Sequence, residues 1–141
     1  MSTEENKALA RRWYEKFNAH SLAGIMEDYA PDFVAHDVPP GISPDLTGVK
    51  QFYAAFFPAF PDAHLVMEDL IAEGDKVVQR WTLRGTHQGE FMGIPPTGKR
   101  VSLIGINIAR IKDGKFVEGW NNEDDLGLMQ QLGAIPQMAH A

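Results

Sequence analysis

Residues 101–122 read VSLIGINIARIKDGKFVEGWNN and predict two β-strands joined by a tight hairpin. The pair Asp113-Gly114 is typical of a two-residue turn, because such a turn needs positive φ angles that Gly and Asp tolerate. Apolar residues dominate 101–111 before the turn, and 116–122 follows it as the last strand. An antiparallel sheet is therefore the structure to expect around this hairpin.

The residues upstream predict a second hairpin. Segments 64–72 and 76–84 are rich in β-branched and apolar residues, and Glu73-Gly74-Asp75 between them is a turn sequence. A Gly- and Pro-rich connection, 85–98, then leads to the strand at 101. The two hairpins together predict an antiparallel meander.

Helices are predicted before and after the meander in the sequence. Ser2 begins one that runs to about Phe17, and further helices are predicted at 22–29, 48–57 and 125–132. A short strand, 33–38, lies between the second and third helices and ends at Pro39-Pro40-Gly41. The order predicts an α+β fold, in which N-terminal helices pack over the concave face of a curved sheet and leave a small-molecule site at its mouth.

The length of 141 residues predicts a single domain, 1–141, with a core of about 7–136. Thirteen basic against nineteen acidic residues give a net charge of −6, which disfavours nucleic acid and anionic membranes as partners. The chain has no cysteine, so disulfides, thiolate nucleophiles and cysteine metal sites are excluded. No signal-like or membrane-length apolar segment is evident, and a cytoplasmic location is expected.

Several motifs together resemble one family. They are Gly85 to Lys99 (GTHQGEFMGIPPTGK), Asp113-Gly114-Lys115, Glu118-Gly119-Trp120 with Asp124 four residues beyond the Trp, and the closing LGLMQQLG of 126–133. In this combination the chain resembles the SnoaL-like polyketide cyclases over about residues 7–136.

The resemblance implies a cone-shaped fold of the nuclear transport factor 2 type, with a homodimer formed through the outer face of the sheet. It also implies an enzyme that needs neither metal nor cofactor and closes a polyketide ring by intramolecular aldol addition. One pocket aspartate acts as acid and base in such enzymes, and Asp124 matches its position. Asp125 lies next to it, and a shift of one residue would exchange the two.

Strand alternation favours Asp124 as the pocket acid. If the last strand continues, Trp120, Asn122 and Asp124 share one face, and Asp125 caps the following helix. Apolar neighbours such as Trp120 would raise the pKa of Asp124 toward neutrality, where a carboxyl group can both take and return a proton. The alternative is that Asp124 merely caps the last helix.

Two histidines are candidates for the same site. His87 could donate a hydrogen bond to a developing enolate oxygen, or it could fix its loop by bonding a backbone carbonyl. His36 faces the pocket if Asp37 faces away, and could bind substrate. The spacing of His36, His64 and His87 matches no known metal-ligand motif, so no metal site is predicted.

Further residues are candidates for binding substrate. Arg80 could bind a ligand carboxylate or carbonyl, or form an ion pair on a sheet face. Asn107 is a polar exception in an apolar strand. Asn122 raises the same question, because either amide could bond a ligand or a neighbouring backbone group. Phe33, Phe56 and Trp120 could form an aromatic wall and Met92 could cover the ligand, although aromatic residues at such spacings also build ordinary cores.

Three functions follow from these residues. The first is a cyclase, or a related lyase or isomerase, that acts on a small apolar or aromatic carbonyl compound through Asp124 and His87. The second is a small-molecule binding protein without catalysis, because a fold does not fix a function. The third is an epoxide or ester hydrolase in which Asp124 activates water. Related epoxide hydrolases carry an Arg-x-Asp pair on what looks like this strand. Here Arg80 is followed two residues later by Thr82, which stands where the acid would be.

Overall fold

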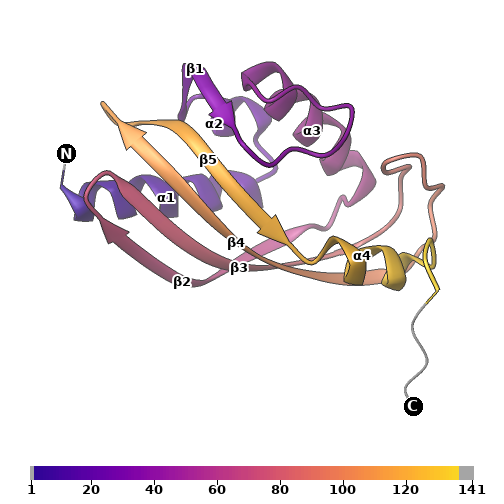
Figure 1. Cartoon of the computed structure of the whole chain (residues 1–141). Helices are drawn as coiled ribbons and strands as arrows, with labels where there is room; N and C mark the ends of the chain where they lie inside the picture. Colours follow the sequence, from indigo (N-terminus) through magenta and orange to yellow (C-terminus); the bar gives the residue numbers. More distant parts are fainter. Residues whose placement is uncertain (1, 137–141) are drawn as a thin grey trace.

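The computed structural model describes residues 2–136 and has four helices and five strands within them (Figure 1). Their order is α1 (Thr3–Asn18), α2 (Leu22–Met26), β1 (Tyr29–Ala35), α3 (Leu46–Ala59), β2 (His64–Glu73), β3 (Lys76–Thr86), β4 (Arg100–Lys112), β5 (Lys115–Glu123) and α4 (Asp125–Leu132). Figure 1 shows a curved sheet, with α2 and α3 on one side of it and α4 at its end. Among the described residues, no helix is long and apolar enough to cross a membrane.

The sheet confirms the predicted α+β architecture and adds a pairing that the sequence did not indicate. Its strand order is β1-β5-β4-β3-β2, and the pairs from β2 to β5 are antiparallel, as expected for a meander. The first strand, however, pairs with β5 in parallel, so the sheet is not entirely antiparallel. This strand also begins at Tyr29 and not at Phe33, because the preceding helix ends at Met26.

A β-bulge in β5 decides which side chains of that strand face the helices. Ile111 pairs with Phe116, but the next pair is Arg110 with Glu118, so Val117 is an extra residue in β5. An extra residue reverses the alternation beyond it. Gly119 is therefore an inward residue, and so are the second and fourth residues after it, Asn121 and Glu123.

Two apolar clusters hold the helices on the sheet. The larger one joins Tyr14 and Phe17 of α1 and Phe56 of α3 to Leu65 and Trp81 of the sheet. The smaller one packs Leu9 and Ala10 of α1 against Val77, Ala109 and Ile111. The Ser2 side chain accepts a hydrogen bond from the Glu5 amide, which confirms the predicted start of α1.

Candidate active site

A cavity of about 370 Å³ lies between the sheet and the helices α1 and α3. This volume falls within the range of small-molecule sites in proteins. Its wall is mostly apolar and includes eleven aromatic side chains: Trp13, Tyr14, Phe17, Tyr29, Phe33, Phe52, Tyr53, Phe56, Trp81, Phe91 and Phe116. The few polar groups in such an apolar enclosure therefore decide where the polar atoms of a ligand can lie.

Within residues 2–136, Glu123 carries the single carboxyl group that the sheet contributes to the cavity lining. It lies in a row of three residues paired directly across the strands, Trp81, Gly105 and Glu123, which we call the acid rung. The Trp81 ring covers Gly105, since a Cβ atom there would lie only 2.3 Å from the ring. Glycine at 105 thus lets the indole extend across β4 in the direction of Glu123.

The surroundings of Glu123 hold its carboxyl group near neutrality. Burial raises its pKa from 4.5 to about 7, and the charge of Asp125 adds to the rise. The Asn121 Nδ2 group donates a hydrogen bond of 3.3 Å to the Glu123 Oε1 atom. At pH 7 the group is therefore about half ionised, which suits a proton acceptor that must later return the proton.

The next row of the sheet is built of three side-chain amides. Gln79, Asn107 and Asn121 pair directly across β3, β4 and β5, and we call this row the amide rung. All three line the cavity, and the Gln79 Nε2 group donates a hydrogen bond of 3.1 Å to Asn107 Oδ1. The inner face of the sheet thus presents a strip of amides beside the acid.

Tyr29 of β1, Tyr53 of α3 and Trp13 of α1 bring further polar groups to the cavity. Burial raises the pKa of Tyr29 and of Tyr53 well above the ordinary value, and the nearby Glu123 charge contributes for Tyr53. Both phenols therefore stay protonated and can donate hydrogen bonds. The Trp13 Nε1 atom is buried in the same wall and has no hydrogen-bond partner among the residues that the structure describes.

The charged side chains in the described lining of the cavity are acidic. Asp37 and Asp125 lie at its exposed rim and Glu123 lies inside it, whereas the described lining contains no Lys, Arg or His. Burial and the charge of Asp124 raise the pKa of Asp125. An anionic ligand would find no positive partner in this lining.

The structure corrects the predicted position of Asp124. Its side chain is exposed outside the cavity lining, and Oδ1 accepts a hydrogen bond of 2.9 Å from the Gly127 amide at the start of α4. The capping alternative is therefore confirmed for this residue. The reason is the bulge at Val117, which exchanges the two faces of β5 and brings Glu123 to the cavity.

His87 also lies outside the cavity lining, contrary to the prediction of a pocket residue. Its side chain is 0% exposed and stacks on Phe60. Its Nδ1 atom accepts a hydrogen bond of 3.3 Å from the Thr97 amide and lies 3.0 Å from Thr97 Oγ1. His87 thus contacts the connection between β3 and β4, as the alternative expected, but through the amide and hydroxyl of Thr97 and not through a backbone carbonyl.

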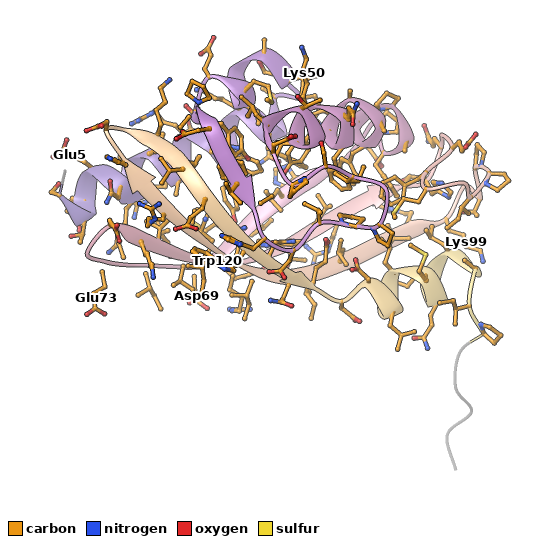
Figure 2. The ribbon with its side chains drawn as sticks, turned by 45° about the horizontal axis from the view of Figure 1, so that its top comes forward. Glu5, Lys50, Asp69, Glu73, Lys99 and Trp120 are labelled. Atoms are coloured by element: carbon orange, nitrogen blue, oxygen red, sulfur yellow. The ribbon has the colours of Figure 1, made fainter. Side chains whose placement is uncertain are left out.

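Four further candidates project from the outer face of the sheet or its edge. His36 stacks on Trp120 at 4.6 Å and pairs with Glu118, and Arg80 forms an ion pair with Asp69 at 2.6 Å. Asn122 is exposed opposite Ile106. In Figure 2 Asp69 points away from the sheet, on the side opposite Lys50 of α3. The predictions that His36, Trp120, Asn122 and Arg80 line the pocket are therefore wrong.

The remaining candidates do line the cavity. They are Asn107, Phe33, Phe56 and Met92, and their role in binding substrate stays a prediction. Sequence reasoning missed Glu123, Gln79 and the two tyrosines. Gly119 is the signal for the first, because an isolated glycine in a strand often marks a bulge. Gln79 alternates with Val77 and Trp81, which are both buried, so it shares their inward face.

Comparison with known proteins agrees with this fold and cavity. The profile of the family described as SnoaL-like polyketide cyclase matches residues 8–132. Aklanonic acid methyl ester cyclase DnrD of Streptomyces peucetius is 33% identical over 140 residues, which cover 94% of this chain and 92% of that protein. Aklanonic acid methyl ester cyclase DauD of Streptomyces sp. (strain C5) is 34% identical over 133 residues, which cover 89% and 80%.

Solved structures are similar as well. TsrD from Streptomyces laurentii superposes with a TM-score of 0.86 at 29% identity, covering 96% of this chain and 99% of that one. AclR from Streptomyces galilaeus has a TM-score of 0.86 at 34% identity, with 98% and 87% covered. Since the family profile spans nearly all of the sequence and the relatives match along most of their length, the chain belongs to the SnoaL-like polyketide cyclases.

Proposed function

We propose that this protein closes a ring in a neutral, mostly apolar carbonyl compound by intramolecular aldol addition, with Glu123 as acid and base. One observation supports this above the others: a carboxyl group with a pKa of about 7 lies inside an aromatic cavity. Neither a metal nor a cofactor takes part in the proposed reaction.

The proposed reaction conserves protons. The Glu123 carboxylate takes a proton from a methylene group between two carbonyls, and the electrons of that C–H bond become an enolate. The enolate carbon then bonds to a second carbonyl carbon of the same molecule, whose oxygen becomes an alkoxide. The protonated Glu123 returns its proton to that oxygen, so that the enzyme ends as it began.

The charge around the cavity supports a neutral substrate. A carboxylate ligand would meet Glu123 and Asp125 with no cation in the described lining, whereas an ester would not be repelled. Two relatives are named as cyclases of a methyl ester, which agrees with this argument. Aklanonic acid methyl ester is therefore the first substrate to assay, beside the free acid.

The test is turnover by a Glu123→Gln variant, which keeps the shape of the side chain and removes its ability to accept a proton. We expect kcat to fall by about 10²–10⁴, the usual contribution of a general acid–base group. Asp124→Asn is the matched control, because it changes the adjacent residue while keeping an oxygen for the helix cap, and should retain activity within a few fold. Full activity of Glu123→Gln would refute the assignment.

The same assay separates the cyclase from the other two functions. Hydrolysis incorporates oxygen from labelled water into the product, whereas aldol closure incorporates none into the new bond. Arg80 and Thr82 project from the outer face of β3, so the pair compared with epoxide hydrolases does not reach the cavity. Tight binding of methyl esters without any turnover would favour the binding protein.

A further inference from the structure

We propose, building on the proposed function, that Gln79 is a positioning residue that fixes the amide of Asn107. In this orientation the Asn107 Nδ2 group donates a hydrogen bond to a carbonyl oxygen of the bound ligand. The pair would thus make the cavity selective for flat apolar molecules that carry a carbonyl group.

The geometry of the amide rung supports this role. Gln79 is 5% exposed, and its Nε2 group donates to Asn107 Oδ1 at 3.1 Å. Both residues point inward from directly paired positions of β3 and β4, and both line the cavity. Because the Asn107 oxygen is already engaged, its nitrogen is the group left for a ligand.

Glu123, which lies next to the amide rung, favours the same orientation of the Asn107 amide from the other side. The Glu123 carboxylate can only accept hydrogen bonds, and it takes one from Asn121 Nδ2 at 3.3 Å. With Nδ2 turned to Glu123, Asn121 also offers its Oδ1 atom as an acceptor, and it lies directly across the strand from Asn107. An oxygen there favours an N–H group on Asn107 over a C=O group. Both neighbours of Asn107 therefore favour one orientation of its amide.

A donor fixed in this way acts more strongly than one in water. The cavity wall is mostly apolar, so few water molecules compete for the N–H group and the local dielectric constant is low. A ligand without an oxygen at that point leaves the donor unpaired, which lowers its affinity. The expected ligand class is therefore a planar ketone or ester.

The test compares two flat probes that differ only by the carbonyl group, 9-fluorenone and fluorene. Equilibrium dialysis gives the dissociation constant of each probe for the 141-residue chain. We expect the wild-type protein to bind fluorenone about fivefold or more tighter than fluorene, the effect of one hydrogen bond in such an environment. The ratio of the two dissociation constants measures the contribution of the Asn107 donor. The constant for fluorene alone measures how well the shape of the cavity fits a flat apolar molecule.

Two variants test the positioning role. Gln79→Met removes the amide and keeps the length of the side chain, and Asn107→Leu removes the proposed donor. Each should reduce the preference for fluorenone to about twofold or less while the affinity for fluorene stays within a factor of about two. The double variant should lose no more than Asn107→Leu alone, because both changes remove the same interaction.

Gln51→Met on the exposed side of α3 is the matched control and should leave both constants unchanged. If Gln79→Met does not fold, as its melting curve would show, Gln79→Leu replaces it. A preference that survives the loss of Gln79 but not of Asn107 would overturn the positioning role. Equal binding of both probes by the wild-type protein would overturn the donor itself.

Binding and turnover are measured separately here. A failure of the probe experiment leaves the Glu123→Gln turnover test standing. Conversely, active Glu123→Gln protein with an intact fluorenone preference would refute the proposed function and keep this inference.

Discussion

At the level of single residues, Glu123 is the position where stability and chemistry are in conflict. Its pKa is raised by burial from 4.5 to about 7, so the folded protein prefers the neutral form. The resulting stability is fully present below pH 4.5 and is lost as the pH rises through about 7. Ionised Glu123 is therefore a destabilising group at alkaline pH.

Glu123→Gln should accordingly raise the free energy of unfolding at pH 9 by about 3–4 kcal/mol, at about 1.4 kcal/mol for each unit of pKa. Near pH 4.5 the same variant should match the wild-type protein. Urea denaturation at several pH values measures the difference. A difference that does not change with pH would mean that Glu123 ionises in the folded protein as it does in the unfolded chain.

The residue types of the site were predictable, whereas the identity of the acid was not. A half-buried Asn in an apolar strand and a set of aromatic side chains pointed correctly to the cavity, as Asn107 and Phe56 show. The identity of the acid depended on which side chains of β5 face inward, and one extra residue in the strand reverses that alternation. With regular alternation from Phe116, the inward set would have been Trp120, Asn122 and Asp124; the bulge makes it Asn121 and Glu123.

At the level of helices and strands, local sequence predicted most elements because each has strong end signals. The Asp113-Gly114 turn fixes the β4–β5 hairpin, and Gly133 with positive φ ends α4. The parallel partner of β5 could not be found in this way. β1 pairs with it across about 85 intervening residues, and no local propensity encodes such a pairing.

Within the sheet, Gly105 links the packing of β3 to the chemistry of β5. Gly105→Ala would place a Cβ atom 2.3 Å from the Trp81 ring, so the indole must move. We expect destabilisation by about 1–3 kcal/mol, as for other overpacked cores. We also expect the pKa of Glu123 to fall, because the displaced ring would admit water to the carboxyl group.

The measurement for this variant is the pH dependence of kcat/KM, whose rising limb should move to lower pH than in the wild-type enzyme. Gly74→Ala in the β2–β3 turn is a suitable control, since nothing lies within 4 Å of a Cβ atom there and the positive φ still costs stability. An unchanged profile in a destabilised Gly105→Ala protein would show that Trp81 does not control the acid.

At the level of the whole molecule, the homodimer expected from the family stays a prediction. The outer face of β4 exposes Ile104 and Ile106 to 57% and 48%, and both would be covered if a second copy packed there. We expect the double variant Ile104→Lys, Ile106→Lys to sediment as a monomer and the wild-type protein as a dimer. Equal sedimentation of the two would place the contact elsewhere or remove it.

The overall charge and the acidic rim together favour neutral ligands over anions. The chain has a net charge of −6, and Asp37 and Asp125 flank the entrance to the acid. Two acids about a Debye length or less from an entering carboxylate repel it, and the repulsion weakens as salt is added. A neutral ester should therefore have a kcat/KM at least about tenfold above that of the matching free acid, at low salt and pH 8.

The variant Asp37→Asn, Asp125→Asn should narrow this gap by improving turnover of the free acid while leaving the ester within about twofold. Raising the ionic strength should have the same effect on the wild-type enzyme, because exposed charges are screened and the aromatic wall is not. If salt and both substitutions leave the ratio of ester to acid unchanged, the selection is made by contacts inside the cavity. Glu123 of the acid rung, with no cation beside it in the described lining, is then the group that rejects the carboxylate.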